Sequence, residues 1–186
     1  MNTDDLICVG STGPFLFNSV INRNKNLIPR EVISEIIDGT NSFFNKMKEY
    51  GIDLIHMGGE TADLGDLVRT VVVDSTISVR MKRSEVIENN IQAGDVIVGF
   101  ASYGKAIYED EYNGGMGSNG LTSARHDALH KSYATKYPES FDISLNDEVI
   151  YCGSKFLTDI VEGTTRNVGQ LILSPTRTYA PLMKMI

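Results

Sequence analysis

The stretch from Tyr112 to Asp127, YNGGMGSNGLTSARHD, constrains the fold most, because its glycines free the backbone from the limits that a Cβ atom imposes. Gly117 and Gly120 lie directly before helix-forming residues whose apolar positions recur at helical spacing. We therefore expect a glycine-rich turn that leads into a helix over Leu121–Tyr137.

Such a turn is typical of a phosphate site, because a helix N-terminus presents unpaired N–H groups and the positive end of its dipole. We predict that Gly117, Ser118, Asn119 and Gly120 bind phosphate oxygens, with Gly120 at positive φ. The same residues are equally compatible with a surface loop that ends in an ordinary helix cap.

Composition limits the partners that this chain can have. Its 186 residues are 41% hydrophobic, enough to bury the core of one domain or slightly more. The net charge of −7 argues against nucleic acid or an anionic membrane surface as the main partner. An anionic ligand must therefore be held locally, by backbone groups or by a metal ion.

Cysteine usage and hydropathy indicate the compartment. Cys8 and Cys152 lie far apart, outside any metal-binding pattern, so we expect reduced thiols. No apolar run reaches the length of a membrane span, and the acidic start of the chain differs from a signal peptide. The expectation is a cytoplasmic protein that binds neither membrane nor nucleic acid.

The apolar pattern predicts an α/β (α+β) fold, in which a mixed sheet carries helices on one face. A helix is expected over Pro29–Tyr50, ended by Gly51, and a short helix is expected to begin at Pro14. Leu6–Val9 is expected to be a strand. Because a strand so near the start has little before it to pair with, we expect the chain to begin inside a domain.

Later strands are expected to lead to the ligand. Ile52–Met57 is predicted to be a buried strand, so Glu60 is expected just past its carboxyl end, where ligands bind in α/β sheets. Leu67–Val73 and Thr76–Met81 are predicted to form a hairpin. Val96–Ala101 is predicted to be a fully buried strand that leads into the glycine-rich stretch.

A polar segment over Pro138–Glu148 marks the expected hinge between two domains. We predict one domain over residues 1–137, and a linker with the beginning of a second domain over residues 138–186. A helix is expected after Pro175.

Acidic residues near predicted strands could hold Mg²⁺, which prefers hard oxygen ligands. The candidates are Asp4, Asp5, Glu60 and Asp63. Gly58 and Gly59 would let the backbone approach a ligand closely. The alternative is that these carboxylates only cap turns and keep sheet edges soluble.

Three other chemistries find less support in the sequence. Gly99–Ala106 matches the phosphate-loop pattern except at Ala106, which lacks the hydroxyl that would hold Mg²⁺. His56, His126 and His130 could include a general acid or base, but they form no metal-binding motif. A serine nucleophile lacks the GxSxG elbow.

Five segments in order resemble motifs of aminoimidazole ribonucleotide synthetase, the phosphoribosylformylglycinamidine cyclo-ligase family. They are MNTDDLICVGSTGPFLF, MGGETAD, AGDVIVGFASYG, GSNGLTSAR and SPTRTY, and they cover nearly the whole chain. GGETA is shared with a wider superfamily that includes selenophosphate synthetase and thiamine-monophosphate kinase. The PTR-x-Y element narrows the resemblance to the cyclo-ligase.

The resemblance implies a ligase of purine biosynthesis that closes the ring of formylglycinamidine ribonucleotide, with ATP as co-substrate and Mg²⁺ as cofactor. Such chemistry needs positioning and charge neutralisation more than a protein nucleophile. Asp4 and Glu60 match the implied metal ligands. The residues implied for ATP or phosphate binding are Gly58, Gly59, Gly117, Ser118, Asn119, Gly120, Thr176 and Arg177. No catalytic residue is assigned.

The resemblance further implies a homodimer, and it makes the chain the latter part of the family's N-terminal domain plus the opening of its second domain. Gly117 stands where many family members have histidine, and residues 105–115 are an insertion. Because the other parts of the family enzyme are missing, two alternatives stay open. One is another ATP-using synthetase or kinase of the superfamily, and the other is a non-catalytic nucleotide-binding or dimerisation fragment.

Overall fold

The computed structural model describes every residue from Met1 to Ile186 and divides into two compact units. Unit 1 comprises Met1–Val96 with Thr178–Ile186, and unit 2 comprises Ile97–Arg177. The boundary predicted between residues 137 and 138 falls inside unit 2, and the domain assignment stays a prediction. None of the helices combines the length and the apolar character that crossing a membrane requires.

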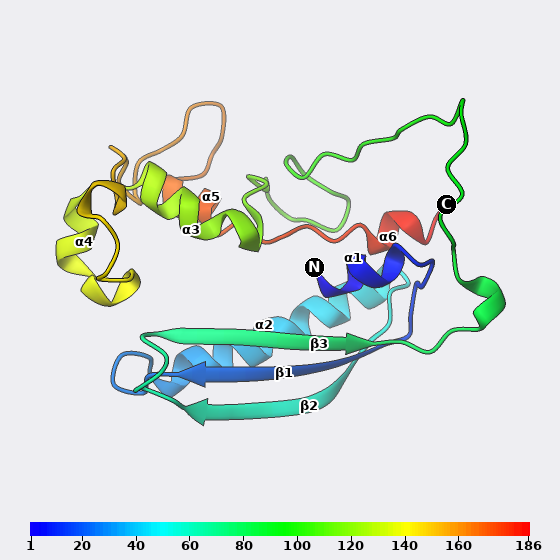
Figure 1. The fold of residues 1–186 in the computed structure, drawn as a ribbon, viewed down its shortest axis with the longest axis horizontal. Helices are drawn as coiled ribbons and strands as arrows, with labels where there is room; N and C mark the ends of the chain where they lie inside the picture. The colour runs from blue at the N-terminus through cyan, green and yellow to red at the C-terminus, as the bar shows by residue number, and fades with distance from the viewer. The chain divides into compact units, whose positions relative to one another are not determined.

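Unit 1 contains a three-stranded mixed sheet, which confirms the predicted α/β class (Figure 1). The central strand is β1 (Phe15–Arg23), with β2 (Leu54–Asp63) parallel on one side and β3 (Val71–Ser78) antiparallel on the other. The order β2-β1-β3 therefore makes β1 the only strand of this sheet with two neighbours.

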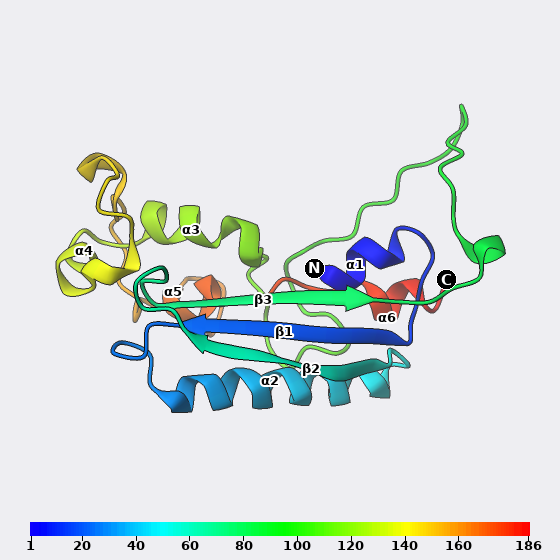
Figure 2. The ribbon, with the colours of Figure 1, turned by 60° about the horizontal axis from the view of Figure 1, so that its bottom comes forward.

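Helix α2 (Arg30–Glu49) lies along one face of this sheet and confirms the helix predicted over Pro29–Tyr50 (Figure 2). Gly51 follows at φ +79°, the left-handed conformation that suits a residue after a helix. The rings of Phe17 on β1 and Phe44 on α2 meet at 4.9 Å. The largest fully buried side chains of unit 1 gather at one end of this layer: Phe15, Met47 and Ile52.

Two predictions for the start of the chain are wrong. Leu6–Val9 is not a strand, because α1 (Asn2–Ile7) includes its first residues and contacts α6 (Ala180–Met183). An apolar run so short does not distinguish a strand from a helix by its period. The segment after Pro14 is β1 rather than a helix, and its burial alternates between buried and exposed residues as a half-buried strand requires.

Three predicted strand boundaries are also wrong, because each depends on a pairing partner elsewhere in the chain. Strand β2 continues through GGETAD, so Glu60 lies inside it opposite Val20 rather than past its end. Strand β3 runs through Asp74 and Ser75 without a hairpin turn. Residues 96–101 form no strand, and Ile97 is fully exposed.

Unit 2 is built from short helices. They are α3 (Gly117–Ala128), α4 (Ser132–Lys136), α5 (Val168–Ile172), and the 3₁₀ turns η2 (Pro138–Ser140) and η3 (Asp147–Val149); a further turn, η1 (Arg83–Glu85), belongs to unit 1. The helix predicted over Leu121–Tyr137 is divided, because the backbone of Leu129 is extended and the N–H of His130 donates to Lys155.

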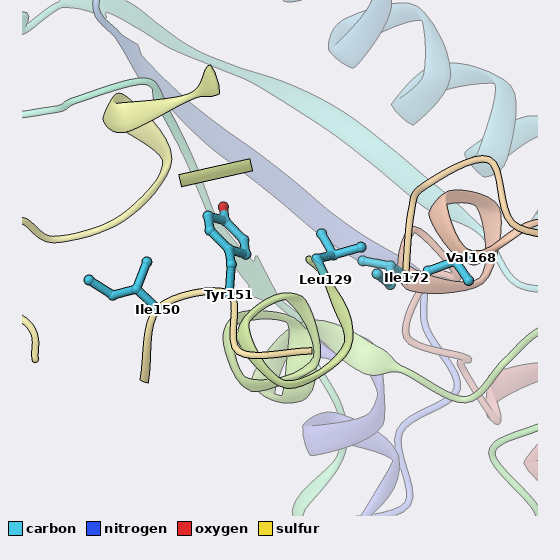
Figure 3. Close-up of a cluster of buried hydrophobic side chains, with 5 residues drawn as sticks. All are labelled: Leu129, Ile150, Tyr151, Val168 and Ile172. Atoms are coloured by element: carbon cyan, nitrogen blue, oxygen red, sulfur yellow. The ribbon is translucent and has the colours of Figure 1, made fainter. Parts of the chain in front are cut away.

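The core of unit 2 packs against the end of α3. Figure 3 shows its buried side chains, which come from the residues after α3, from the segment after η3 and from α5: Leu129, Ile150, Tyr151, Val168 and Ile172. Gly153 crosses this end of α3 so closely that a Cβ atom would lie 2.2 Å from the carbonyl oxygen of Ala128. The glycine is therefore required by packing.

The glycine pair of GGETAD has a structural role in the sheet. The register between β1 and β2 shifts between Phe17 and Ser19, so that Gly58 adopts φ +115° and Gly59 approaches the β1 backbone. A Cβ atom on Gly59 would lie 2.1 Å from the carbonyl oxygen of Ser19, whereas Gly39 in α2 has open space around it.

We expect Gly59→Ala to lower the free energy of unfolding by about 1–3 kcal/mol, the usual cost of overpacking. Gly39→Ala is the matched control and should raise it by about 0.5–1 kcal/mol, because alanine favours a helix. Urea unfolding followed by circular dichroism measures both. Equal effects of the two substitutions would show that the bulge tolerates a side chain.

Candidate functional site

Two segments that are far apart in sequence meet within unit 2, residues 101–118 and residues 174–177. We call this region the polar junction. The backbones of Gly104 and Asn113 pair with each other through two hydrogen bonds of 2.9 and 2.8 Å. The N–H of Ser118 donates to Oγ1 of Thr176 at 2.8 Å. The GSNG and PTR motifs, both predicted to bind phosphate, are therefore in direct contact.

A buried ion pair lies at the centre of the polar junction. The side chains of Arg177 and Glu109 are only 8% and 10% exposed. Nε of Arg177 donates to Oε1 of Glu109 at 3.1 Å, and Nη2 donates to Oε2 at 2.5 Å. This two-pronged arrangement is the strong form of an arginine–carboxylate contact.

The remaining N–H groups of Arg177 bind backbone carbonyls. Nη1 donates to the oxygens of Ala101 and Tyr103 at 2.9 and 3.0 Å, and Nη2 donates to the oxygen of Gly104 at 3.0 Å. A guanidinium group carries five N–H donors. Each donor of Arg177 therefore has an acceptor from unit 2, and the predicted phosphate would have to replace one of them.

Glu109 accepts four hydrogen bonds, which keep it ionised. Besides the two from Arg177, it accepts from the N–H of Ala106 at 2.6 Å and from Nδ2 of Asn113 at 2.9 Å. Burial raises the pKa of Glu109, but the bonds from Arg177, Ala106 and Asn113 outweigh it and lower that pKa below its usual 4.5. The stability that this ionisation contributes is thus present above about pH 4.5 and is lost as the pH falls through the folded-state pKa.

Asn113 and Ser174 complete the polar junction. Asn113 is 3% exposed, donates to the carbonyl of Pro175 at 2.9 Å and accepts from the N–H of Gly115 at 2.8 Å. Oγ of the buried Ser174 accepts from the N–H of Gly114 at 2.8 Å. Sequence reasoning missed these two residues and Glu109. Their one available signal was proximity to the glycine-rich and PTR motifs.

The glycine-rich stretch forms the first turn of α3. Gly117 has φ +64°, but Gly120 lies inside α3 without a positive φ and with open space around it. The positive φ predicted at Gly120 is therefore wrong, because the helix begins at Gly117, four residues before the expected start at Leu121. The first turn of α3 has no acidic residue and no side-chain cap, and Ser118 and Asn119 are exposed there. Phosphate binding by this turn stays a prediction.

The two predicted metal ligands both lie in unit 1. Oδ1 of Asp4 accepts the N–H of Tyr179 at 2.7 Å. Glu60 is exposed on β2 and accepts the N–H of Thr61 at 3.1 Å. No group of three or more histidine, cysteine, aspartate or glutamate side chains is placed to hold a metal ion. Magnesium binding by Asp4 and Glu60 stays a prediction.

Each of the three histidines forms a hydrogen bond within the chain: His56 with Asn41, His130 with Ser132 and His126 with Tyr151. His126 is buried, and its Nδ1 accepts the N–H of Tyr151 at 3.2 Å, which leaves Nε2 as the protonated nitrogen of the neutral ring. Burial, and then the charge of Arg125, lower the pKa of His126. His126 is therefore a neutral core residue rather than a group poised to exchange protons.

A cavity of about 290 Å³ in unit 1 is lined by Asp63, one of the acidic residues considered for Mg²⁺, and by none of the other predicted site residues. It is found where the start of α2 meets the ends of β1 and β2, and Arg23, Arg30 and Asp63 contribute its charged groups. Asp63 is engaged by Lys25 through an ion pair of 3.0 Å.

Comparison with curated proteins gives the resemblance independent support. The chain is 30% identical over 191 residues to a protein of Methanocaldococcus jannaschii named phosphoribosylformylglycinamidine cyclo-ligase. Proteins of the same name from Methanococcus maripaludis and Thermoplasma acidophilum are 31% identical over 188 residues and 26% identical over 180 residues. No protein-family model matches the chain.

A mixed α/β sheet and a polar junction built from the GSNG and PTR motifs are thus found in a chain whose homologues are ligases by name. The resemblance to the cyclo-ligase family is confirmed, because these homologues carry the name phosphoribosylformylglycinamidine cyclo-ligase. The proteins of Methanocaldococcus jannaschii and Methanococcus maripaludis align with all of this chain. The chain spans about 42% of their length.

We expect Arg177→Met to lower the free energy of unfolding by about 3–5 kcal/mol, because it leaves the buried carboxylate of Glu109 without its partner. Lys105→Met removes an exposed positive charge from the same loop and should change it by less than about 0.5 kcal/mol. Urea unfolding of both variants makes the comparison. A small effect at Arg177 would mean that the ion pair is dispensable to unit 2.

Proposed function

We propose that this chain takes part in the ATP-dependent ring closure of formylglycinamidine ribonucleotide to aminoimidazole ribonucleotide, in purine biosynthesis. The observation that carries the proposal is the similarity of the whole chain to curated cyclo-ligases. The contact between Ser118 and Thr176 supports it, because two motifs of the resemblance that lie 58 positions apart in sequence meet in the structure.

The first turn of α3 suits the phosphate part of such a substrate. It combines the positive end of a helix dipole with the exposed hydroxyl of Ser118 and the exposed amide of Asn119, and no acidic residue opposes an anion there. Thr176 adds a hydroxyl beside this turn. In the proposed reaction these groups bind and orient phosphate oxygens of ATP or of the ribonucleotide.

Magnesium, a homodimer and a cytoplasmic location are further parts of the proposal. Mg²⁺ is commonly bound by one or two carboxylates together with substrate phosphates and water. Asp4 and Glu60 are the carboxylates that the resemblance assigns to it. The exposed side chains of Leu16 and Val20 on β1 supply apolar surface that a second copy of the chain could cover.

An assay of ATP consumption tests the reaction. Whatever ATP consumption the chain supports should be greater with formylglycinamidine ribonucleotide than with selenide or thiamine monophosphate, which are the substrates of related synthetases and kinases. Preference for one of the other two would replace the cyclo-ligase by that member of the superfamily.

A second candidate function is nucleotide binding without turnover, for which the exposed hydroxyl of Ser118 and the exposed amide of Asn119 at the first turn of α3 would suffice. We expect the 186-residue chain alone to bind ATP but to release little or no phosphate. Robust turnover by this chain would exclude the second candidate, and absence of ATP binding in calorimetry would exclude both.

Replacing the predicted metal ligands tests the magnesium part separately. Asp4→Asn and Glu60→Gln should each weaken Mg²⁺-dependent ATP binding by about tenfold or more, because each removes a negative charge without changing size. Asp66→Asn, at an exposed aspartate of unit 1, is the control and should bind normally. Calorimetric titration with and without Mg²⁺ gives the affinities. Unchanged values in both variants would leave Asp4 as a backbone cap and Glu60 as a strand residue.

A further inference from the structure

We propose that the Nε/Nη2 edge of Arg177 is an anion-binding site whose occupant in this structure is the chain's own Glu109. The ligand that competes for it carries a phosphate or diphosphate group. The inference rests on the proposed function in one respect, that the natural ligand contains phosphate.

The geometry of the pair carries this inference. Glu109 places its two oxygens at 3.1 and 2.5 Å from Nε and Nη2 of Arg177. Two oxygens of a phosphate group can take the same two positions, because carboxylate and phosphate both match the fork of a guanidinium. Arg177 belongs to the PTR motif, and the preceding Thr176 contacts the first turn of α3, so a phosphate on Arg177 would lie next to that turn.

Arg177 would keep its position if Glu109 left. Its remaining donors bind the carbonyl oxygens of Ala101, Tyr103 and Gly104, which are independent of the Glu109 carboxylate. Backbone carbonyls therefore fix the position of the guanidinium group, while its Nε/Nη2 edge binds a carboxylate. A site organised in this way binds an anion without first having to order its arginine.

Residues 105–113 are attached to unit 2 by contacts that do not involve the Glu109 carboxylate. Tyr108 is buried, Glu111 forms an ion pair with Arg166, and the backbones of Gly104 and Asn113 close the loop at its base. Exchange thus requires the Glu109 side chain to swing out, with the loss of its bonds from Ala106 and Asn113. An incoming phosphate replaces the negative charge that Arg177 loses as a partner when Glu109 leaves.

Calorimetric titration of the full chain with inorganic pyrophosphate tests the proposal. Glu109→Gln should bind pyrophosphate about tenfold more tightly than the unchanged chain, because the neutral amide competes less well for Arg177. Glu111→Gln removes the same charge from the same loop and should change affinity by less than about threefold. The double variant Glu109→Gln with Arg177→Met should lose the gain. Equal affinities of the two single variants, or a gain that survives in the double variant, would overturn the proposal.

Hydrogen exchange of the unchanged chain decides the matter if Glu109→Gln does not fold. The N–H of Ala106, which donates to Glu109, should exchange faster at saturating pyrophosphate, whereas the N–H of Ser118, which donates to Thr176, should not. No change at Ala106 would overturn the proposal. ATP binding that is unaffected at Ala106 and by Glu109→Gln would overturn it while leaving the proposed function in place. If Glu109→Gln binds pyrophosphate more tightly but the chain binds no ATP, the anion site at Arg177 would stand and the proposed function would be overturned.

Discussion

A buried guanidinium group must have both its charge and its five donors satisfied, and the polar junction is arranged around this requirement at Arg177. Three backbone carbonyls turn inward to meet it, which fixes the path of residues 101–104. The carboxylate of Glu109 neutralises the charge, which fixes the position of the insertion over residues 105–115. Asn113 then ties Glu109 to the chain before Arg177 through the carbonyl of Pro175. One side chain thereby orders a region that contains almost no regular secondary structure.

The motif glycines illustrate how one residue can be explained twice. Gly58 and Gly59 belong to a segment that resembles a nucleotide-binding motif, yet the bulge between β1 and β2 alone requires them. Gly120 shows the opposite, since neither its backbone nor its surroundings require a glycine. The helical geometry of Gly120 is what an ordinary helix start also shows, so its role toward phosphate stays a prediction.

The sequence was most informative where structure depends on local spacing. The period of α2 and the glycine after it were both predictable, because a helix closes its own hydrogen bonds. Strands β1 and β3 were misjudged because their partners lie elsewhere in the chain. Glu109 and Arg177 are 68 positions apart, and their pairing has no periodic signature. The family motifs identified Arg177 without showing what it contacts. From its charge alone, Glu109 was expected to repel phosphate, whereas in the fold it forms an ion pair with Arg177.

The strand order has a consequence for how unit 1 folds. Strands β2 and β3 follow each other in sequence but flank β1 instead of pairing together, so no strand pair of this sheet is a hairpin. The first ladder can close only after the whole of α2 has been traversed between Phe15 and Leu54. Closing such a long loop costs chain entropy before any pairing repays it, and this slows folding relative to a meander of the same size. Helix α2, in contrast, closes its hydrogen bonds within 20 consecutive residues, so its hydrogen bonds do not depend on these distant pairings.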